Sequence, residues 1–124
     1  MSHRVGVPVS VAFVLGAVLG FAARPSLALA KGERVALENE KVRVVEFVLE
    51  PGVAMGMHDH PRDRVEITLA GGRVRVTTPD GKTQEVDEKE GSVVFNKASA
   101  ARHDVANIGT RALRAYHVEL KPQP

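Results

Sequence analysis

Residues 52–61 read GVAMGMHDHP and place two histidines, His58 and His60, in a segment that we expect to be extended. Alternate residues of a strand share a face, so the two imidazoles leave the same side of the backbone, about 6.5–7 Å apart. Imidazole suits Zn, Fe, Ni, Mn or Cu, and a third ligand from another strand would hold such an ion well. His103 is the candidate, because it shares a strand face with Val105 that would point into a barrel. The pattern predicts one divalent metal site.

The chain from Glu33 onward has the pattern of an all-β protein. It shows no long helical period, and β-branched residues alternate with charged ones between turn signals about ten residues apart. Short antiparallel strands at this spacing favour a sandwich or barrel. We expect eight or nine strands, over residues 35–38, 41–49, 53–60, 65–70, 73–77, 83–87, 92–96, 102–106 and 111–120.

Two stretches of the chain resemble the paired motifs of the cupin superfamily. The first has Gly52, five residues, His58, one residue and His60, with Gly71-Gly72 further on; the second has Gly91, then His103, three residues and Asn107. The runs 39–44, 57–61, 79–83 and 118–121 are similar to small single-domain cupins, a group that includes the β-alanine degradation proteins of the BauB kind. The resemblance covers roughly residues 33–121. It implies an antiparallel jelly-roll barrel with a metal ion on the motif histidines.

The match to the motifs is incomplete at two points. His103 comes one residue late, which implies a one-residue bulge or a longer turn before it. The family's carboxylate is expected after His60, where Arg64 and Val65 stand. Glu66 and Asp63 are the possible substitutes as a fourth ligand.

The orientation of Glu66 can be predicted if Gly71-Gly72 is a two-residue hairpin loop with positive φ. Cross-strand pairing then makes one apolar, inward face from Val65, Ile67, Leu69, Val74 and Val76. Glu66 would point outward, with Arg75 as its diagonal partner, unless a bulge reverses it. The favoured site is therefore an open face of three histidines, with Val65 where the carboxylate would be.

The first thirty residues are typical of a secretory signal peptide. Arg4 precedes an almost wholly apolar run over 5–23, and Ala28-Leu29-Ala30 supplies the small-x-small pattern of a cleavage site. We expect residues 1–30 to be removed, leaving residues 31–124 as a single periplasmic or secreted domain. If uncleaved, the nineteen apolar residues would span about 28 Å and anchor the chain in a membrane.

Charge and cysteine content narrow the possible partners. The chain has 17 Lys and Arg against 15 Asp and Glu, and residues 1–30 hold two of the arginines and no acidic residue. The remaining domain is balanced, so it lacks the basic patch that nucleic-acid binding needs. It has no cysteine, and a domain of this size buries only about 60–65% of its unfolded surface. A bound metal would add stability, and we expect the domain to form a homodimer.

Two classes of function fit a three-histidine site. Three neutral ligands leave the ion its full charge and open positions, so it can act as a Lewis acid or bind dioxygen. The first hypothesis is a metal-dependent enzyme, such as a dioxygenase, hydrolase or isomerase, acting on a small oxygen-rich molecule. The alternative is a non-catalytic metal- or small-ligand-binding protein or sensor.

The other polar and sulfur-containing candidates have simpler interpretations. His117 is expected to be a packed or surface strand residue, and Met55 and Met57 to pack on the face opposite His58. Arg62 and Arg64 are expected in a solvated corner, where one of them could alternatively bind an anionic substrate at the barrel mouth.

Overall fold

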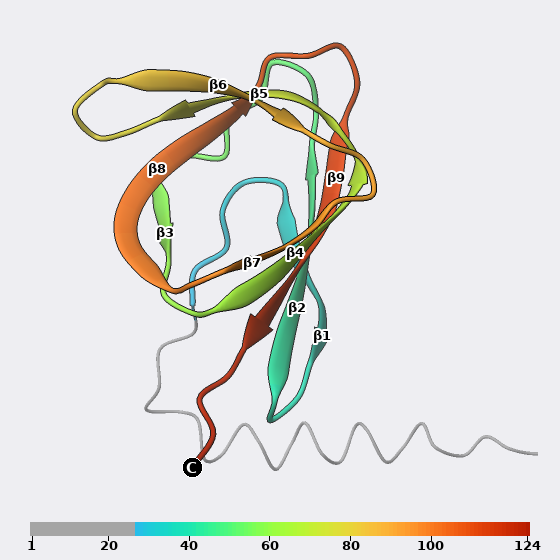
Figure 1. Cartoon of the computed structure of the whole chain (residues 1–124), viewed down its shortest axis with the longest axis vertical. Helices are drawn as coiled ribbons and strands as arrows, with labels where there is room; N and C mark the ends of the chain where they lie inside the picture. Colours follow the sequence, from blue (N-terminus) through green and yellow to red (C-terminus); the bar gives the residue numbers. More distant parts are fainter. Residues whose placement is uncertain (1–26) are drawn as a thin grey trace, which may run out of the picture.

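The computed structural model describes residues 27–124, which form nine strands and two sheets (Figure 1). Residues 1–26, most of the predicted signal peptide, lie outside the described residues. The strands are β1 Glu33–Glu38, β2 Val42–Leu49, β3 His58–His60, β4 Arg64–Ala70, β5 Gly72–Thr77, β6 Thr83–Glu88, β7 Val93–Asn96, β8 Ser99–Asn107 and β9 Leu113–Leu120. The all-β prediction is confirmed. No helix among residues 27–124 is long and apolar enough to cross a membrane.

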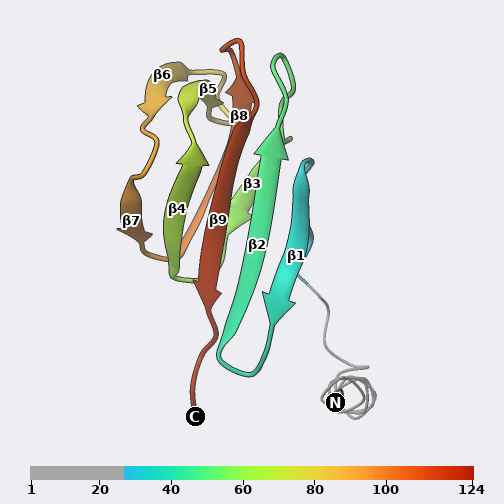
Figure 2. The same cartoon turned by 90° about the vertical axis from the view of Figure 1, so that its right-hand side faces the viewer.

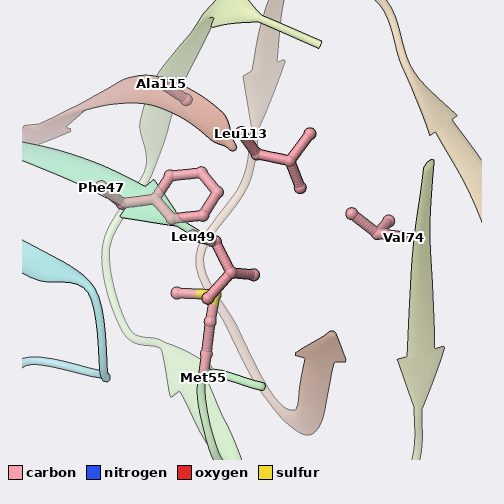
Figure 3. Packing of buried hydrophobic residues seen from close by; sticks show 6 residues of the cluster. All are labelled: Phe47, Leu49, Met55, Val74, Leu113 and Ala115. Atoms are coloured by element: carbon pink, nitrogen blue, oxygen red, sulfur yellow. The ribbon is translucent and has the colours of Figure 1, made fainter. Parts of the chain in front are cut away.

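The two sheets are antiparallel and face each other. One has the order β1-β2-β9-β4-β7, seen face-on in Figure 2, and the other β3-β8-β5-β6. The core lies between them and draws on both sheets (Figure 3), with Phe47, Leu49, Met55, Val74, Leu113 and Ala115 as its buried members. Sheet-on-sheet packing buries one face of a strand. On β9 the buried residues Leu113, Ala115 and His117 therefore alternate with more exposed ones and point toward the site described below.

The register between β2, β9 and β4 decides which polar residues point inward. Phe47 lies opposite Ala115, and Val45 lies opposite His117. On the other side of β9, His117 pairs with Glu66. Directly opposite residues in a sheet share a face, so Glu66 and His117 face the interior with Phe47.

The predicted hairpin at Gly71-Gly72 is wrong. Strand β4 pairs with β7 and β9, whereas β5 pairs with β6 and β8, so the chain crosses from one sheet to the other at the two glycines. Neither glycine has a positive φ. Glycine is needed there for space, since a Cβ on Gly71 would lie 2.2 Å from the Glu88 carbonyl oxygen and one on Gly72 2.8 Å from a Leu113 methyl group.

The crossing also explains the wrong prediction for the faces of β4. Without a turn the alternation continues unbroken, so the even-numbered residues of β4 and β5 face inward. Thr68 and Val74 are buried, while Leu69 is exposed. Glu66 and Arg64 therefore point inward, and the outward orientation predicted for Glu66 is corrected.

Residues 27–30 contact the barrel. The Leu27 carbonyl accepts a hydrogen bond from Nη1 of the buried Arg43 at 3.0 Å, and Ala30 packs against the core. The next residue, Lys31, donates its backbone N–H to the Met55 carbonyl. The segment joins the fold immediately before β1.

Candidate metal centre

The three predicted histidines come together across strands β3 and β8. His58 lies directly opposite His103, and His60 pairs with Ser99. A step of two residues along β3 therefore corresponds to a step of four residues along β8. The register shift before His103 amounts to two residues, where the late position of His103 predicted a one-residue bulge or a longer turn. One ligand nitrogen from each ring lies within 4.8 Å of the other two. The structure thus positions His58, His60 and His103 to hold one metal ion.

The distances between the rings fit shared coordination. Nε2 of His60 and Nε2 of His103 are 3.2 Å apart. Two imidazole nitrogens bound at about 2.0–2.1 Å to one ion lie roughly 2.9–3.4 Å apart. The three ring centroids are 4.7–5.1 Å from one another.

The Gly56 turn orients His58. The Nδ1 of His58 lies 2.7 Å from the Gly56 carbonyl oxygen and can donate to it, which leaves Nε2 as the metal-binding atom. The Gly56 N–H donates in turn to Asp104 Oδ1 at 2.9 Å. Gly56 has φ of 93°, a conformation that favours glycine. Of the strand expected over 53–60, only His58–His60 forms β3, because the chain turns at Gly56. Met55, before the turn, packs in the core and lines the cavity with His58 instead of facing away from it.

Burial favours the neutral form of two of the three imidazoles, His60 and His103. Burial, assisted by the charge of Arg64, lowers the pKa of His60 to about 3. Burial likewise lowers the pKa of His103. Neutral imidazole is the form that binds metal, so at neutral pH these two rings need not lose a proton first.

A cavity of about 260 Å³ adjoins the three histidines. Its polar lining includes Arg64, Glu66, Thr68, Glu88, Asn96 and His117, and its apolar lining includes Phe47, Val74, Val76, Val105 and Leu113. The interior is therefore richer in polar groups than the sequence indicated.

His117, expected from the sequence to be a packed or surface strand residue, is packed and also lines this cavity. It is buried, its ring centroid lies 6.0 Å from that of His60, and its Nε2 lies 4.0 Å from Glu66 Oε2. Burial lowers its pKa as well. The alternation of Leu113, Ala115 and His117 on one strand face was the available signal for its place in the cavity.

Both candidate fourth ligands have other partners. Oε2 of Glu66 accepts a hydrogen bond from Nε of Arg64 at 2.7 Å and lies 2.5 Å from Nη2 in the same ion pair. Oδ1 of Asp63 accepts from the Ala98 backbone N–H at 2.8 Å. Arg64 is buried in the cavity rather than in a solvated corner, whereas Arg62 lies near Glu119, 3.8 Å away.

Comparison with known proteins agrees with the predicted family and fold. The chain is 30% identical over 87 residues to the β-alanine degradation protein BauB of Pseudomonas aeruginosa, a match that covers 70% of this chain and 90% of that protein. The chain is a small cupin. No protein-family model matches it.

Solved structures show the same fold as this cupin. A cupin domain from Bordetella pertussis has a TM-score of 0.67 at 23% identity and covers 79% of this chain and 100% of that one. An RmlC-like cupin with a double-stranded β-helix fold, from Methanocaldococcus jannaschii, has a TM-score of 0.56 at 21% identity, covering 78% and 84%. The polyketide cyclase RemF of Streptomyces resistomycificus has a TM-score of 0.55 at 22% identity, covering 77% and 69%.

Proposed function

We propose that this cupin binds one divalent metal ion through His58, His60 and His103, and that it is a metal-dependent enzyme acting on a small oxygen-rich molecule. The observation that carries the proposal is the opening of three converging imidazoles onto a cavity with a mixed polar and apolar lining. The export signal expected over residues 1–30 would place this activity in the periplasm or outside the cell.

The three histidines are proposed as the whole protein ligand set. Glu66 is held by Arg64 and Asp63 by the Ala98 amide, so neither is counted as a ligand. Three nitrogen donors suit Fe, Mn, Ni, Zn or Cu. Such an ion, when bound, supplies Lewis-acid or dioxygen chemistry at positions that the protein leaves open.

The polar residues inside favour catalysis over simple metal storage. Glu66 and His117 are 4.0 Å apart, which places a carboxylate and an imidazole where a proton can be accepted and returned. Burial and the charge of Glu66 raise the pKa of Glu88, a third group suited to carrying a proton in this cavity. A storage site would need none of these groups.

The name of the relative BauB is consistent with a small polar substrate, since it places that protein in β-alanine degradation. For the present chain we propose the wider class of small oxygen-bearing molecules that fit about 260 Å³. This volume is below the roughly 300–1,000 Å³ of pockets for drug-sized ligands.

The test is turnover by the metal-loaded protein. The protein is loaded separately with Fe²⁺, Mn²⁺, Ni²⁺ and Zn²⁺, and a panel of short hydroxy acids and diketones is followed by NMR and by an oxygen electrode. We expect turnover with at least one combination of metal and substrate. Glu66→Gln should reduce this turnover about 100-fold or more while the metal content stays the same. Stoichiometric metal without turnover of any member would contradict catalysis and support the non-catalytic binding role.

A further inference from the structure

Arg64 is a buried cation inside the cavity that the three histidines line. It is the first residue of β4, its exposed fraction is 8%, and its side chain faces the cavity together with Glu66. Burying a guanidinium is costly unless its charge and its N–H groups find partners. Its partners therefore indicate what it is for.

Glu66 satisfies only part of this guanidinium. Nε of Arg64 donates to Oε2 of Glu66, and Nη2 lies 2.5 Å from the same oxygen in the ion pair. A guanidinium has five N–H groups in a planar fork. Among residues 27–124, Nη1 makes no hydrogen bond. It is also not one of the fully buried atoms that lack a partner, so it retains some exposure to solvent. The guanidinium of Arg64 therefore keeps N–H groups on Nη1 that a ligand in the cavity can reach.

The charge balance of the cavity favours an anion. The metal-binding histidines are neutral ligands, and Arg64 and Glu66 cancel each other. Arg114 also lines the cavity, but its Nε is bonded to Glu46 at 2.6 Å. A divalent ion then leaves an excess of positive charge that Glu88, the other acidic residue in the lining, offsets only in part. A ligand with one negative charge would reduce this excess.

The shape and lining of the cavity limit the rest of the ligand. The volume of about 260 Å³ admits only a small molecule, and Val74, Val76 and Val105 provide an apolar wall for a short carbon chain. Arg pairs with carboxylates through two parallel N–H bonds, a geometry that a neutral alcohol or ketone cannot match.

We propose that Arg64 binds the carboxylate of a small monocarboxylic acid, whose second oxygen-bearing group is directed toward the three histidines. The inference rests on the proposed function for the metal, and it adds the substrate class, short hydroxy or oxo acids. Glu66 positions the guanidinium by holding Nε and Nη2, so that Nη1 is presented to the ligand.

The test uses glycolate and its neutral isostere glycolamide as probes. Each is titrated into the Co²⁺-loaded protein, and the visible absorption of the ion reports binding. The variants are Arg64→Gln, Arg64→Lys and the double variant Arg64→Gln, Glu66→Gln. The double variant is included because the single Arg64→Gln variant leaves the Glu66 carboxylate unpaired and could fold poorly. Arg73→Gln is the matched control, since Arg73 is also ion-paired to acidic residues but lies outside the cavity.

We expect the native protein and the Arg73 variant to bind glycolate at least about tenfold more tightly than either Gln variant does, with Arg64→Lys between them. Glycolamide binding should be weak and equal in all. Equal glycolate affinity in the native protein and both Gln variants would overturn the proposal.

A metal-free arm separates this inference from the metal proposal. The same glycolate titration is followed by NMR of backbone amides and the Arg64 Nε–H in protein without metal. If Co²⁺ fails to bind, the metal proposal fails, while glycolate shifts that depend on Arg64 would still support this one. Absence of Arg64-dependent shifts in both arms would overturn it.

Discussion

Nε2 of His60 and Nε2 of His103 face each other at 3.2 Å across strands β3 and β8. The contact joins two rings whose pKa values burial lowers, and the pKa of His60 falls to about 3. Two protonated rings could not occupy this arrangement, because each nitrogen would then point a proton at the other. The arrangement is stable only while at least one ring is neutral.

This relationship predicts an acid-sensitive metal-free fold. In the unfolded chain His60 takes up a proton near pH 6.5, whereas in the folded chain it does so only near pH 3. The contribution of neutral His60 to the free energy of unfolding is therefore fully present above about pH 6.5. It decreases as the pH falls toward 3, by at most about 1.4 kcal/mol per pH unit. Urea unfolding between pH 7 and pH 4 measures it. The slope should be smaller in His60→Gln, and equal slopes would refute the assignment.

Asn107 is predicted to be a structural residue of the barrel. Its side chain is 1% exposed, donates to the carbonyls of Leu49 and Arg111, and accepts from the Gly109 N–H, each at 2.8 Å. Asn107→Ala should lower the free energy of unfolding by about 2–5 kcal/mol, because buried backbone groups lose their partners.

The matched control for Asn107 is Asn39, whose side chain also bonds the backbone, its Oδ1 accepting from two backbone N–H groups, but in an exposed turn. Asn39→Ala should lower the free energy of unfolding by about 1 kcal/mol or less. Chemical denaturation of the two variants gives the comparison, and similar losses would show that Asn107 has no special role.

Residues 27–30 are predicted to stabilise the barrel even though they precede the expected cleavage site. A chain beginning at Lys31 loses the bond from Arg43 to Leu27 and the packing of Ala30. We expect it to be about 1–3 kcal/mol less stable than one beginning at Leu27, since Arg43 is buried. Thermal unfolding of the two forms tests this, and identical midpoints would contradict it. N-terminal sequencing of the exported protein tests cleavage after Ala30 itself.

The homodimer expected from the sequence has a candidate surface on β7. This strand is an edge of the five-stranded sheet, and Val93, Val94 and Phe95 are 65%, 47% and 53% exposed. Exposed apolar edge strands favour pairing with a second copy. Sedimentation velocity should give twice the mass of one chain, reduced to one chain by Phe95→Glu but not by Leu37→Glu on the opposite edge. A native protein that sediments as a single chain would refute the dimer.

The strands and the histidine cluster could be predicted because they depend on local alternation and on motif spacing. The two-residue period located all nine strands, with some ends shifted, and His58, His60 and His103 converge as predicted. The strands need no knowledge of which strand pairs with which, and the resemblance to the paired cupin motifs supplied the pairing that brings His103 to His58.

The orientation of Glu66 could not be obtained in the same way. Gly-Gly between two apolar runs is typical of a hairpin turn, but here close contacts with Glu88 and Leu113 require the glycines at a crossing between sheets. That nonlocal packing fixes the face of β4. It places Arg64 and Glu66 inside and Leu69 outside, the reverse of what the apolar residues of β4 indicated.

The metal content of the protein purified without a histidine tag tests the central claim most directly. Elemental analysis should find about one transition-metal ion per chain in the native protein and in His117→Gln, a cavity histidine that is not a proposed ligand. The double variant His58→Ala, His60→Ala should retain less than about a tenth of that. The same sub-stoichiometric trace of metal in the native protein and the double variant would contradict the three-histidine metal centre.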